Sequence, residues 1–345
     1  MTKQREFGLD LVRAVAVILV LSVHFFLNSG FYDMPLQGVG MTLAAMVRMA
    51  CMTCVPLFLL LTGWLCIDRR WRLSYPLKLL PILLTYVLAG CLCMVFNAVW
   101  NGIEITPLSA VHRLLDFSAA PYGWYIKMYI GLFLLAPFLN AAWRGLSRAR
   151  GRLVLVIMLL VITAAPAVLN FRHKIVPDWW ANIYPVAYYF LGAWLRDRPV
   201  RGKAWMLVLG WLGLSVLTGG LICLRRQGEM FTSSNWNYYQ SPLVAGETVC
   251  LFCLLARCGE TGTPAPVRWC VGKLSRLSLP IYLLSYITDQ LLYPHLTAAV
   301  PDMSGRLPWM PVMVLAGLTG AGVMAQAVDW AVKALMRLTP KIKNN

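Results

Sequence analysis

Long apolar stretches separated by short charged or Pro- and Gly-rich segments dominate the chain. A membrane-spanning helix needs about 20 mostly apolar residues, and the polar breaks delimit ten candidate stretches. The predicted spans are 8–28, 40–66, 77–100, 123–142, 153–170, 181–195, 204–224, 242–256, 277–295 and 309–335. The pattern therefore predicts an all-α, polytopic membrane helix bundle of about ten transmembrane helices.

Composition supports a membrane protein independently of any motif. The chain is 59% hydrophobic and 13% charged, whereas a soluble domain carries about 25% charged residues. A net charge of +17 would suggest a nucleic-acid partner in a soluble protein. Here the excess of Lys and Arg in cytoplasmic loops explains it, so we expect the lipid bilayer and no nucleic acid as partner.

The distribution of basic residues predicts the topology. With the N-terminus in the cytoplasm, 22 of the 31 Lys and Arg residues fall inside, six fall outside, and Arg13, Arg48 and Lys127 lie within spans. This asymmetry predicts two cytoplasmic termini and an even number of spans. Lys3 and Arg5 precede an apolar run as in a signal peptide. However, charges interrupt that run and no small-residue cleavage site follows, so an uncleaved first helix is predicted.

The segments between the spans are too short for a second domain, so residues 1–345 are predicted to form a single membrane domain. The outer segment 101–122 contains an amphipathic pattern that is typical of a helix on the membrane surface. The outer segment 225–241 mixes amide and aromatic side chains. We interpret it as an interfacial aromatic belt; stacking on a sugar ring is the alternative.

Ten cysteines are present, and two pairs have the spacing of metal ligands, Cys51 with Cys54 and Cys250 with Cys253. Each pair lacks a second pair or a histidine at zinc-site spacing. We interpret them as small packing residues, and neither a metal site nor a disulfide framework is predicted.

Candidate chemistry begins in the first span, where Arg13 and His24 are 11 positions apart. At 3.6 residues per turn this places them on one stripe of a helix, about 16 Å apart along its axis. Asp10 is three residues before Arg13, a spacing that lets the two charges pair. Intramembrane charges usually face a bundle interior or a wet cavity. The pattern therefore suggests two ligand subsites joined by a channel.

Less specific interpretations stay open at this stage. Arg13 could snorkel to the interface, and His24 could bond a neighbouring helix. Arg48 lies deep in the second span and suits an interior partner or an anionic ligand group, whereas Lys127 is nearer a span end and suits snorkelling. The acids that could pair with these cations are Glu247, Asp289 and Asp329.

Two inner basic clusters, 69–72 with Lys78 and 196–203, could receive a phosphorylated cytoplasmic donor. They also satisfy the topology rule without any ligand. On the residues alone, we favour the interpretation without a ligand.

Five motifs in order give the chain a resemblance to a known family over nearly its whole length. They are the stretch 9–16 followed by His24, Arg48 followed by 55–58 and 62–64, Trp124–Tyr129 followed by 137–140, 188–192, and 277–285. The chain resembles integral-membrane acyltransferase family 3, which includes bacterial O-acetyltransferases that act on cell-surface polysaccharides and peptidoglycan.

Two departures from the family pattern affect possible site residues. Many members carry His-Leu before the central Trp, where this chain has Tyr122-Gly123, and many end the late motif with His, where this chain has Ser285. The family's third-helix basic motif is represented loosely by Arg69, Arg72 and Lys78. We expect no counterpart of the extracytoplasmic domain that is fused in some members.

The resemblance implies transfer of an acyl group, expected to be acetyl, from cytoplasmic acyl-CoA to a hydroxyl of an extracytoplasmic carbohydrate. Acetyl-CoA would be a co-substrate and no tightly bound cofactor is expected. The implied location is the bacterial cytoplasmic (inner) membrane. His24 would act as general base, Arg13 would contact the donor, and Arg48 would stabilise charge.

The remaining residues have implied roles of two kinds. Arg69, Arg72 and Lys78 would bind the donor phosphates. Residues that could contact the acceptor or support the site are Asp10, Trp124, Tyr125, Tyr282 and Ser285. The resemblance leaves direct transfer and a covalent acyl intermediate both open.

Two other functions compete with this one. A transporter or flippase of an anionic small molecule or lipid-linked substrate could use the same charges. A membrane sensor or scaffold is a third possibility, which the lack of an additional module in this chain makes less favourable.

Overall fold

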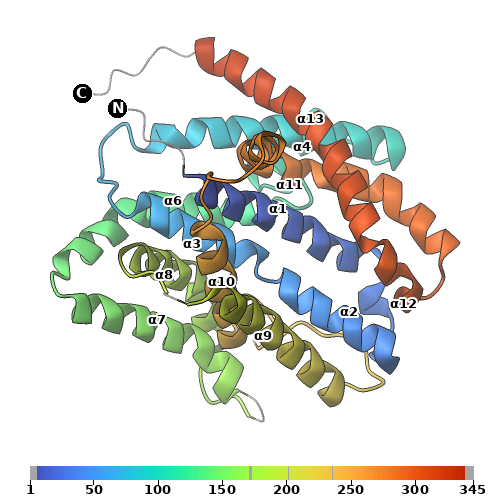
Figure 1. The fold of residues 1–345 in the computed structure, drawn as a ribbon. Coiled ribbons are helices and arrows are strands. Elements are labelled where there is room, and N and C mark those ends of the chain that lie inside the picture. The colour runs from blue at the N-terminus through green and yellow to red at the C-terminus, as the bar shows by residue number, and fades with distance from the viewer. Residues whose placement is uncertain (1–5, 171–172, 201, 235, 339–345) are drawn as a thin grey trace.

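The computed structural model describes residues 6–170, 173–200, 202–234 and 236–338, and these ranges form an all-helical bundle (Figure 1). The basic residues Lys3 and Arg5 lie outside the described ranges. The α-helices are α1 (Phe7–Asn28), α2 (Gly38–Cys51), α3 (Cys54–Cys66), α4 (Leu80–Trp100), α5 (Pro107–Leu115), α6 (Trp124–Gly145), α7 (Ala149–Leu169), α8 (Tyr184–Asp197), α9 (Ala204–Arg225), α10 (Pro242–Ala256), α11 (Ala265–Ala299), α12 (Met303–Arg306) and α13 (Met310–Leu338). Short 3-10 helices are η1 (Phe31–Asp33), η2 (Pro76–Leu79), η3 (Asp178–Ile183) and η4 (Leu307–Trp309).

Within the described residues, seven helical stretches are long and apolar enough to cross a membrane. They are Phe7–Asp33, Gly38–Cys66, Pro76–Trp100, Trp124–Gly145, Ala149–Leu169, Ala204–Arg225 and Met303–Leu338. Three predicted spans fall on helices outside this set: α8 has 14 residues, α10 has 15, and α11 is long but carries several polar and charged side chains. The all-α membrane architecture is therefore confirmed, whereas the count of ten remains a prediction.

The predicted second span is not one helix. A turn at Met52 and Thr53 separates α2 from α3. Pro56 gives the physical reason, because it lacks the N–H that would bond the Met52 carbonyl and its ring would clash with that carbonyl. The hydropathy pattern is continuous across this turn, and for that reason it concealed the break.

The predicted ninth span begins too late. The pattern set its start at residue 277, but α11 begins at Ala265 and continues to Ala299 as one 35-residue helix. Polar residues such as Lys273 and Arg276 interrupt the apolar pattern without interrupting the helix. Hydropathy therefore locates the apolar part of α11 and misses its polar beginning.

Helix α1 occupies the middle of the bundle and packs against α2, α3, α10, α11 and α13 (Figure 1). Its pairing with α11 is parallel, because Asp10 contacts Ser275 near the start of α1 and His24 contacts Ser285 near its end. The two helices are therefore in contact at both ends of the stretch from Asp10 to His24, with a sequence offset of 265 at Asp10 and 261 at His24. Helix α11 therefore supplies partners to both polar positions of α1.

Helices α3 and α8 approach so closely that two glycines are required. A Cβ added at Gly63 would lie 1.8 Å from the Tyr189 carbonyl oxygen, and one added at Gly192 would lie 2.0 Å from the Leu60 carbonyl oxygen. Small residues at a membrane helix interface allow such backbone contact. The glycines thus fix α3 directly against α8.

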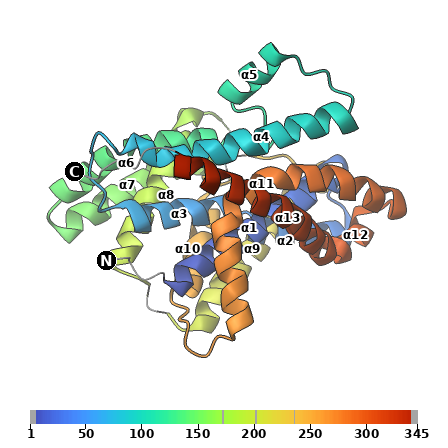
Figure 2. The same ribbon diagram turned by 90° about the horizontal axis from the view of Figure 1, so that it is seen from above.

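Helix α5 is the predicted amphipathic helix of the outer segment 101–122. It has no buried residue and stands away from the bundle (Figure 2). Its first turn is capped by Thr106, whose side chain accepts a hydrogen bond from the Ser109 N–H. The start of α1 and the end of α13 lie on the same side of the molecule (Figures 1 and 2).

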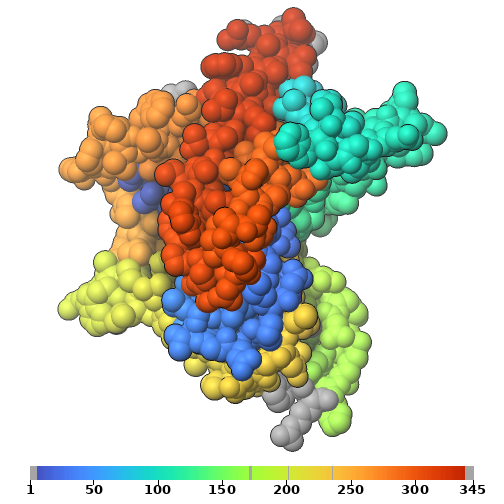
Figure 3. Space-filling view, turned by 90° about the vertical axis from the view of Figure 1, so that its right-hand side faces the viewer, coloured from blue at the N-terminus to red at the C-terminus, as the bar shows by residue number. Residues whose placement is uncertain are grey.

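At the opposite end, two segments distant in sequence are joined through their backbones. The Leu36 N–H donates to the Glu229 carbonyl at 2.8 Å, and the Gly228 N–H donates to the Leu36 carbonyl at 3.2 Å. Figure 3 shows this face, where α2 in blue lies beside the yellow segment that follows α9. The connection from α1 to α2 is therefore held against the connection from α9 to α10.

Candidate active site

A cavity of about 890 Å³ runs beside α1 and is lined by both Arg13 and His24. The uninterrupted helix places the two side chains on one stripe, as the spacing predicts, with about 16 Å of helix rise between them. One cavity therefore joins the two polar positions, and its two ends have different linings.

The Arg13 end is held by a bridge between α1 and α11. The Arg13 Nη1 donates to Ser275 Oγ at 3.0 Å, and Ser275 Oγ donates to Asp10 Oδ1 at 2.6 Å. The Arg13 and Asp10 charges are themselves 3.6 Å apart. The predicted pairing of Asp10 with Arg13 is present, and Ser275 is the additional partner that fixes both.

Two more arginines line this end, Arg69 after α3 and Arg276 on α11. Arg276 Nε lies 3.7 Å from Asp329 Oδ2, so one of the candidate acids does pair with a cation. The cluster offers three guanidinium groups, which suit a phosphorylated ligand because guanidinium binds phosphate through paired hydrogen bonds.

The predicted donor set is only partly brought together. Arg69 lines the cavity, but Arg72 and Lys78 are exposed and lie outside its lining. Arg72 is exposed in the segment that follows α3, and the Lys78 ammonium lies 5.8 Å from the centre of the Tyr75 ring. Of the three residues that loosely match the family's basic motif, the cavity therefore includes Arg69 alone, and donor binding by Arg72 and Lys78 stays a prediction.

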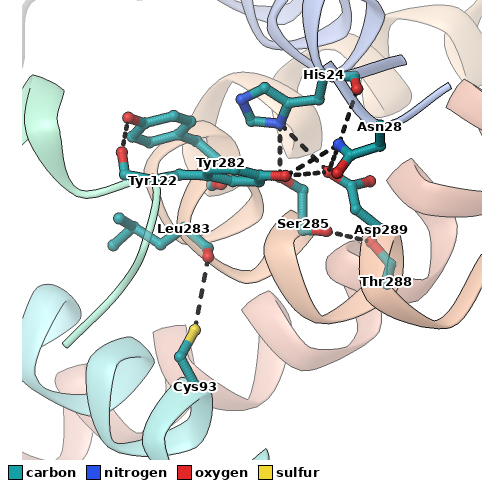
Figure 4. Close-up of polar contacts among 9 residues, drawn as sticks. All are labelled: His24, Asn28, Cys93, Tyr122, Tyr282, Leu283, Ser285, Thr288 and Asp289. Atoms are coloured by element: carbon teal, nitrogen blue, oxygen red, sulfur yellow. Dashed lines mark hydrogen bonds and ion pairs between the residues drawn. The ribbon is translucent and has the colours of Figure 1, made fainter. Parts of the chain in front are cut away.

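His24 lies in a compact polar network at the other end (Figure 4). Its Nδ1 is 3.2 Å from Ser285 Oγ and 3.5 Å from Asp289 Oδ2. The Tyr122 hydroxyl donates to Asp289 Oδ2 at 2.9 Å. Asn28 Nδ2 donates to the Tyr122 hydroxyl oxygen at 3.1 Å and lies 3.4 Å from Asp289 Oδ2. Three groups therefore converge on one carboxylate oxygen.

The directions of these hydrogen bonds define the state of the imidazole. Ser285 Oγ donates to the Tyr282 carbonyl at 2.9 Å, so it acts as acceptor toward His24. The Asp289 carboxylate is an acceptor as well. A proton on Nδ1 satisfies both, and the second ring nitrogen, which points away from Asp289 in Figure 4, then carries the lone pair. In this tautomer the second ring nitrogen is free to accept a hydrogen bond.

Both departures from the family pattern contact His24. The Tyr122 ring centre is 3.9 Å from that of His24, and Ser285 bonds the imidazole. Burial, followed by the charge of Asp289, raises the pKa of Tyr122, so the phenol stays protonated and donates. The Tyr122 carbonyl in turn accepts a hydrogen bond from the Tyr282 hydroxyl. The two replacements therefore belong to one network around the histidine.

Aromatic side chains make up much of the cavity lining. They are Tyr32, Phe58, Tyr122, Trp124, Tyr125, Tyr129, Tyr238, Tyr239 and Tyr282. Tyr238 and Tyr239 belong to the segment 225–241, so part of this segment lines the cavity, and its place in an interfacial aromatic belt stays a prediction. Arg48 is in the same wall, and its Nε donates to the Tyr32 hydroxyl at 2.8 Å. The predicted residues Arg13, His24, Arg48, Trp124, Tyr125 and Tyr282 all line the cavity.

Sequence reasoning missed the roles of Asp289, Asn28, Tyr122, Ser275 and Arg276. One local signal was available: Ser285 and Asp289 are four residues apart, as are His24 and Asn28, and such pairs share a helix face.

Within the described residues, no group of three His, Cys, Asp or Glu side chains is placed to hold a metal ion, and the ten cysteines are free thiols.

Comparison with known proteins identifies the family. The model of the acyltransferase 3 family, described as an acyltransferase domain, matches residues 6–326. No curated protein and no solved structure matches the chain. The family match covers α1 to most of α13 and therefore both helices that hold the polar network. The chain belongs to acyltransferase family 3 and is a multi-pass membrane acyltransferase.

Proposed function

We propose that the protein transfers an acetyl group from cytoplasmic acetyl-CoA to a hydroxyl of an extracytoplasmic glycan. The observation that carries this proposal is the single cavity lined by three arginines at one end and by His24 at the other. A cavity with these two ends would let two substrates approach from opposite sides of a membrane and meet within it.

The arginine end suits the donor. Acetyl-CoA carries several phosphates, and Arg13, Arg69 and Arg276 offer guanidinium groups for them. Asp10 and Ser275 hold Arg13 toward the cavity wall. In this arrangement the CoA arm extends along the cavity, and its thioester reaches His24.

The chemistry is a general-base acyl transfer. The free ring nitrogen of His24 takes the proton of the acceptor hydroxyl, and the oxygen attacks the thioester carbonyl. Collapse of the intermediate breaks the carbon–sulfur bond, and the imidazolium returns its proton to the CoA thiolate. Asp289 orients the imidazole and stabilises its charged form, while Arg48 adds positive potential at this end of the cavity.

The same scheme sets the orientation in the membrane. The arginine end faces the cytoplasm, the His24 end faces the outside, and both termini are cytoplasmic with about ten crossings of a bacterial inner membrane. Basic residues in the inner loops support this direction. The parallel pairing of α1 and α11 fits it too, because the first and ninth spans of such a chain run in the same direction.

The test uses the full chain in lipid nanodiscs with labelled acetyl-CoA and surface glycan isolated from cells that lack the protein. We expect acetyl transfer to the glycan and release of CoA. The variant His24→Ala should abolish transfer, whereas His112→Ala, on exposed α5, should retain it. Mass spectrometry of surface glycans from cells with and without the protein identifies the acceptor.

A transporter or flippase would give a different result. It would move a substrate across a sealed vesicle but would neither hydrolyse nor transfer from acetyl-CoA. Native-rate acetylation by a folded His24→Ala variant would contradict the assignment of the base.

A further inference from the structure

Arg48 is a buried cation without an acidic partner in the part of the chain that the structure describes. Its relative exposure is 1%, and among the described residues no carboxylate lies within ion-pair distance of its guanidinium. Its Nε donates to the Tyr32 hydroxyl at 2.8 Å, and its Nη1 faces the weakly accepting Met49 Sδ at 3.4 Å. An uncompensated buried charge is strongly destabilising. A bound anionic group that neutralises the Arg48 charge would explain why the fold keeps this arginine.

Two aromatic rings hold the guanidinium. Its Cζ lies 4.2 Å from the centre of the Phe231 ring and 5.5 Å from that of Tyr32. Ring faces attract a cation but supply only part of the stabilisation that an anion gives. The rings therefore fix the orientation of the guanidinium, while hydrogen-bond donors remain for a ligand in the cavity that Arg48 lines.

Arg48 lies at the His24 end. Tyr32 follows the last residue of α1 by four positions, and Phe231 is in the segment joined to Leu36 through the backbone. The arginine cluster for the donor is at the other end, where Arg13 already contacts Asp10. The two anion-binding positions are therefore separated along the cavity, and the one at Arg48 is near the reacting hydroxyl.

A single guanidinium suits a single negative charge. We propose that Arg48, with the hydroxyl of Tyr32, binds a carboxylate of the acceptor, so that the acceptor is an acidic glycan such as one that contains uronic acid. The planar fork of arginine matches a carboxylate through two parallel hydrogen bonds. This inference rests on the proposed acetyl transfer and names the class of acceptor for it.

The test compares two acceptors that differ only in charge, methyl β-glucuronoside and its methyl ester, with acetyl-CoA and the full chain in nanodiscs. The wild-type protein should show a kcat/KM for the acid at least about tenfold above that for the ester, because a charge-assisted hydrogen bond is lost in the ester. In Arg48→Gln this ratio should fall to about one. The control Arg113→Gln, on α5, should keep the wild-type ratio.

Stability gives a second readout. Thermal unfolding of Arg48→Gln without substrates should occur at the wild-type temperature or above it, because the variant removes an uncompensated charge. A large decrease would mean that the arginine serves the fold, and it would overturn the proposal. Equal preference for acid and ester in the wild type, or acetylation of neither by a protein that acetylates its surface glycan, would overturn it as well.

Two further results separate related possibilities. If Arg48→Gln changed only a preference for succinyl-CoA over acetyl-CoA, the anion would belong to the donor and the acceptor assignment would be wrong. If the wild-type protein acetylated no glycan at all, the proposed function itself would fail. Acetylated surface material that contains no carboxylate would contradict the acidic acceptor while leaving acetyl transfer intact.

Discussion

The two ends of the cavity differ in how tightly their polar side chains are enclosed. At the His24 end the side chains of His24 and Asp289 are 9% and 4% exposed, whereas those of Arg13 and Arg276 at the other end are 29% and 45% exposed. An enclosed network keeps one geometry, as proton transfer requires. Exposed arginines can admit and release a large polyanion. The difference suggests that one end acts mainly on kcat and the other mainly on KM.

Replacing His24, the proposed base, is the strongest test of this difference between the two ends of the cavity. We expect His24→Ala to lower kcat by about 10²- to 10⁴-fold, the usual contribution of a positioned acid or base. The KM for acetyl-CoA should change little, since the arginine end is untouched. Steady-state kinetics in nanodiscs measures both values. A change confined to KM would place His24 in binding.

Asp289→Asn should have the next largest effect. The carboxylate that orients His24 becomes a neutral amide, and we expect kcat to fall by about 10- to 100-fold with KM for acetyl-CoA unchanged. Asp289→Glu should recover part of the rate because it restores the charge. If Asp289→Glu and Asp289→Asn lowered kcat equally, the charge of Asp289 would have no part in the reaction and the residue would serve only the fold.

Arg69→Gln tests the opposite end. Loss of one charge-assisted hydrogen bond to a phosphate should raise KM for acetyl-CoA by about tenfold or more and leave kcat within a few-fold. The matched control is Arg70→Gln, the exposed neighbour in the same loop. A fall in kcat with KM unchanged would remove the distinction between the two ends.

Tyr122→Phe should have the smallest effect. It deletes the hydroxyl that donates to Asp289 and accepts from Asn28, a loss of about 1 kcal/mol or roughly fivefold in kcat. The ring contact with His24 is retained. A loss as large as that of His24→Ala would instead give the phenol a direct part in proton transfer.

The sequence was sufficient for features that depend on one helix. The stripe from Arg13 to His24 follows from helical periodicity alone, and α1 has that geometry. The turn between α2 and α3 was harder to predict, because it lies inside an unbroken apolar stretch and Pro56 was its only signal. The early start of α11 was missed because polar residues continue a helix beyond its apolar part.

The partners of His24 depend on tertiary structure. Asp289 and Ser285 are more than 260 positions away from it in sequence, and no local pattern specifies which helix will face α1. Asp289 was therefore recognised as an intramembrane acid without a partner. Arg72 shows the converse, because it is close to Arg69 in sequence but does not line the cavity that Arg69 lines.

The close contact between α3 and α8 affects the shape of the cavity as well as the stability of the fold. Gly63 contacts the Tyr189 backbone, while its neighbour Thr62, together with Phe58 and Leu65, faces the cavity from the same helix. A methyl group at Gly63 would have to push α3 away from α8. Gly63 therefore influences the width of the cavity although it has no side chain and does not line the cavity. A narrower cavity would discriminate against longer acyl groups, even with the lining residues unchanged.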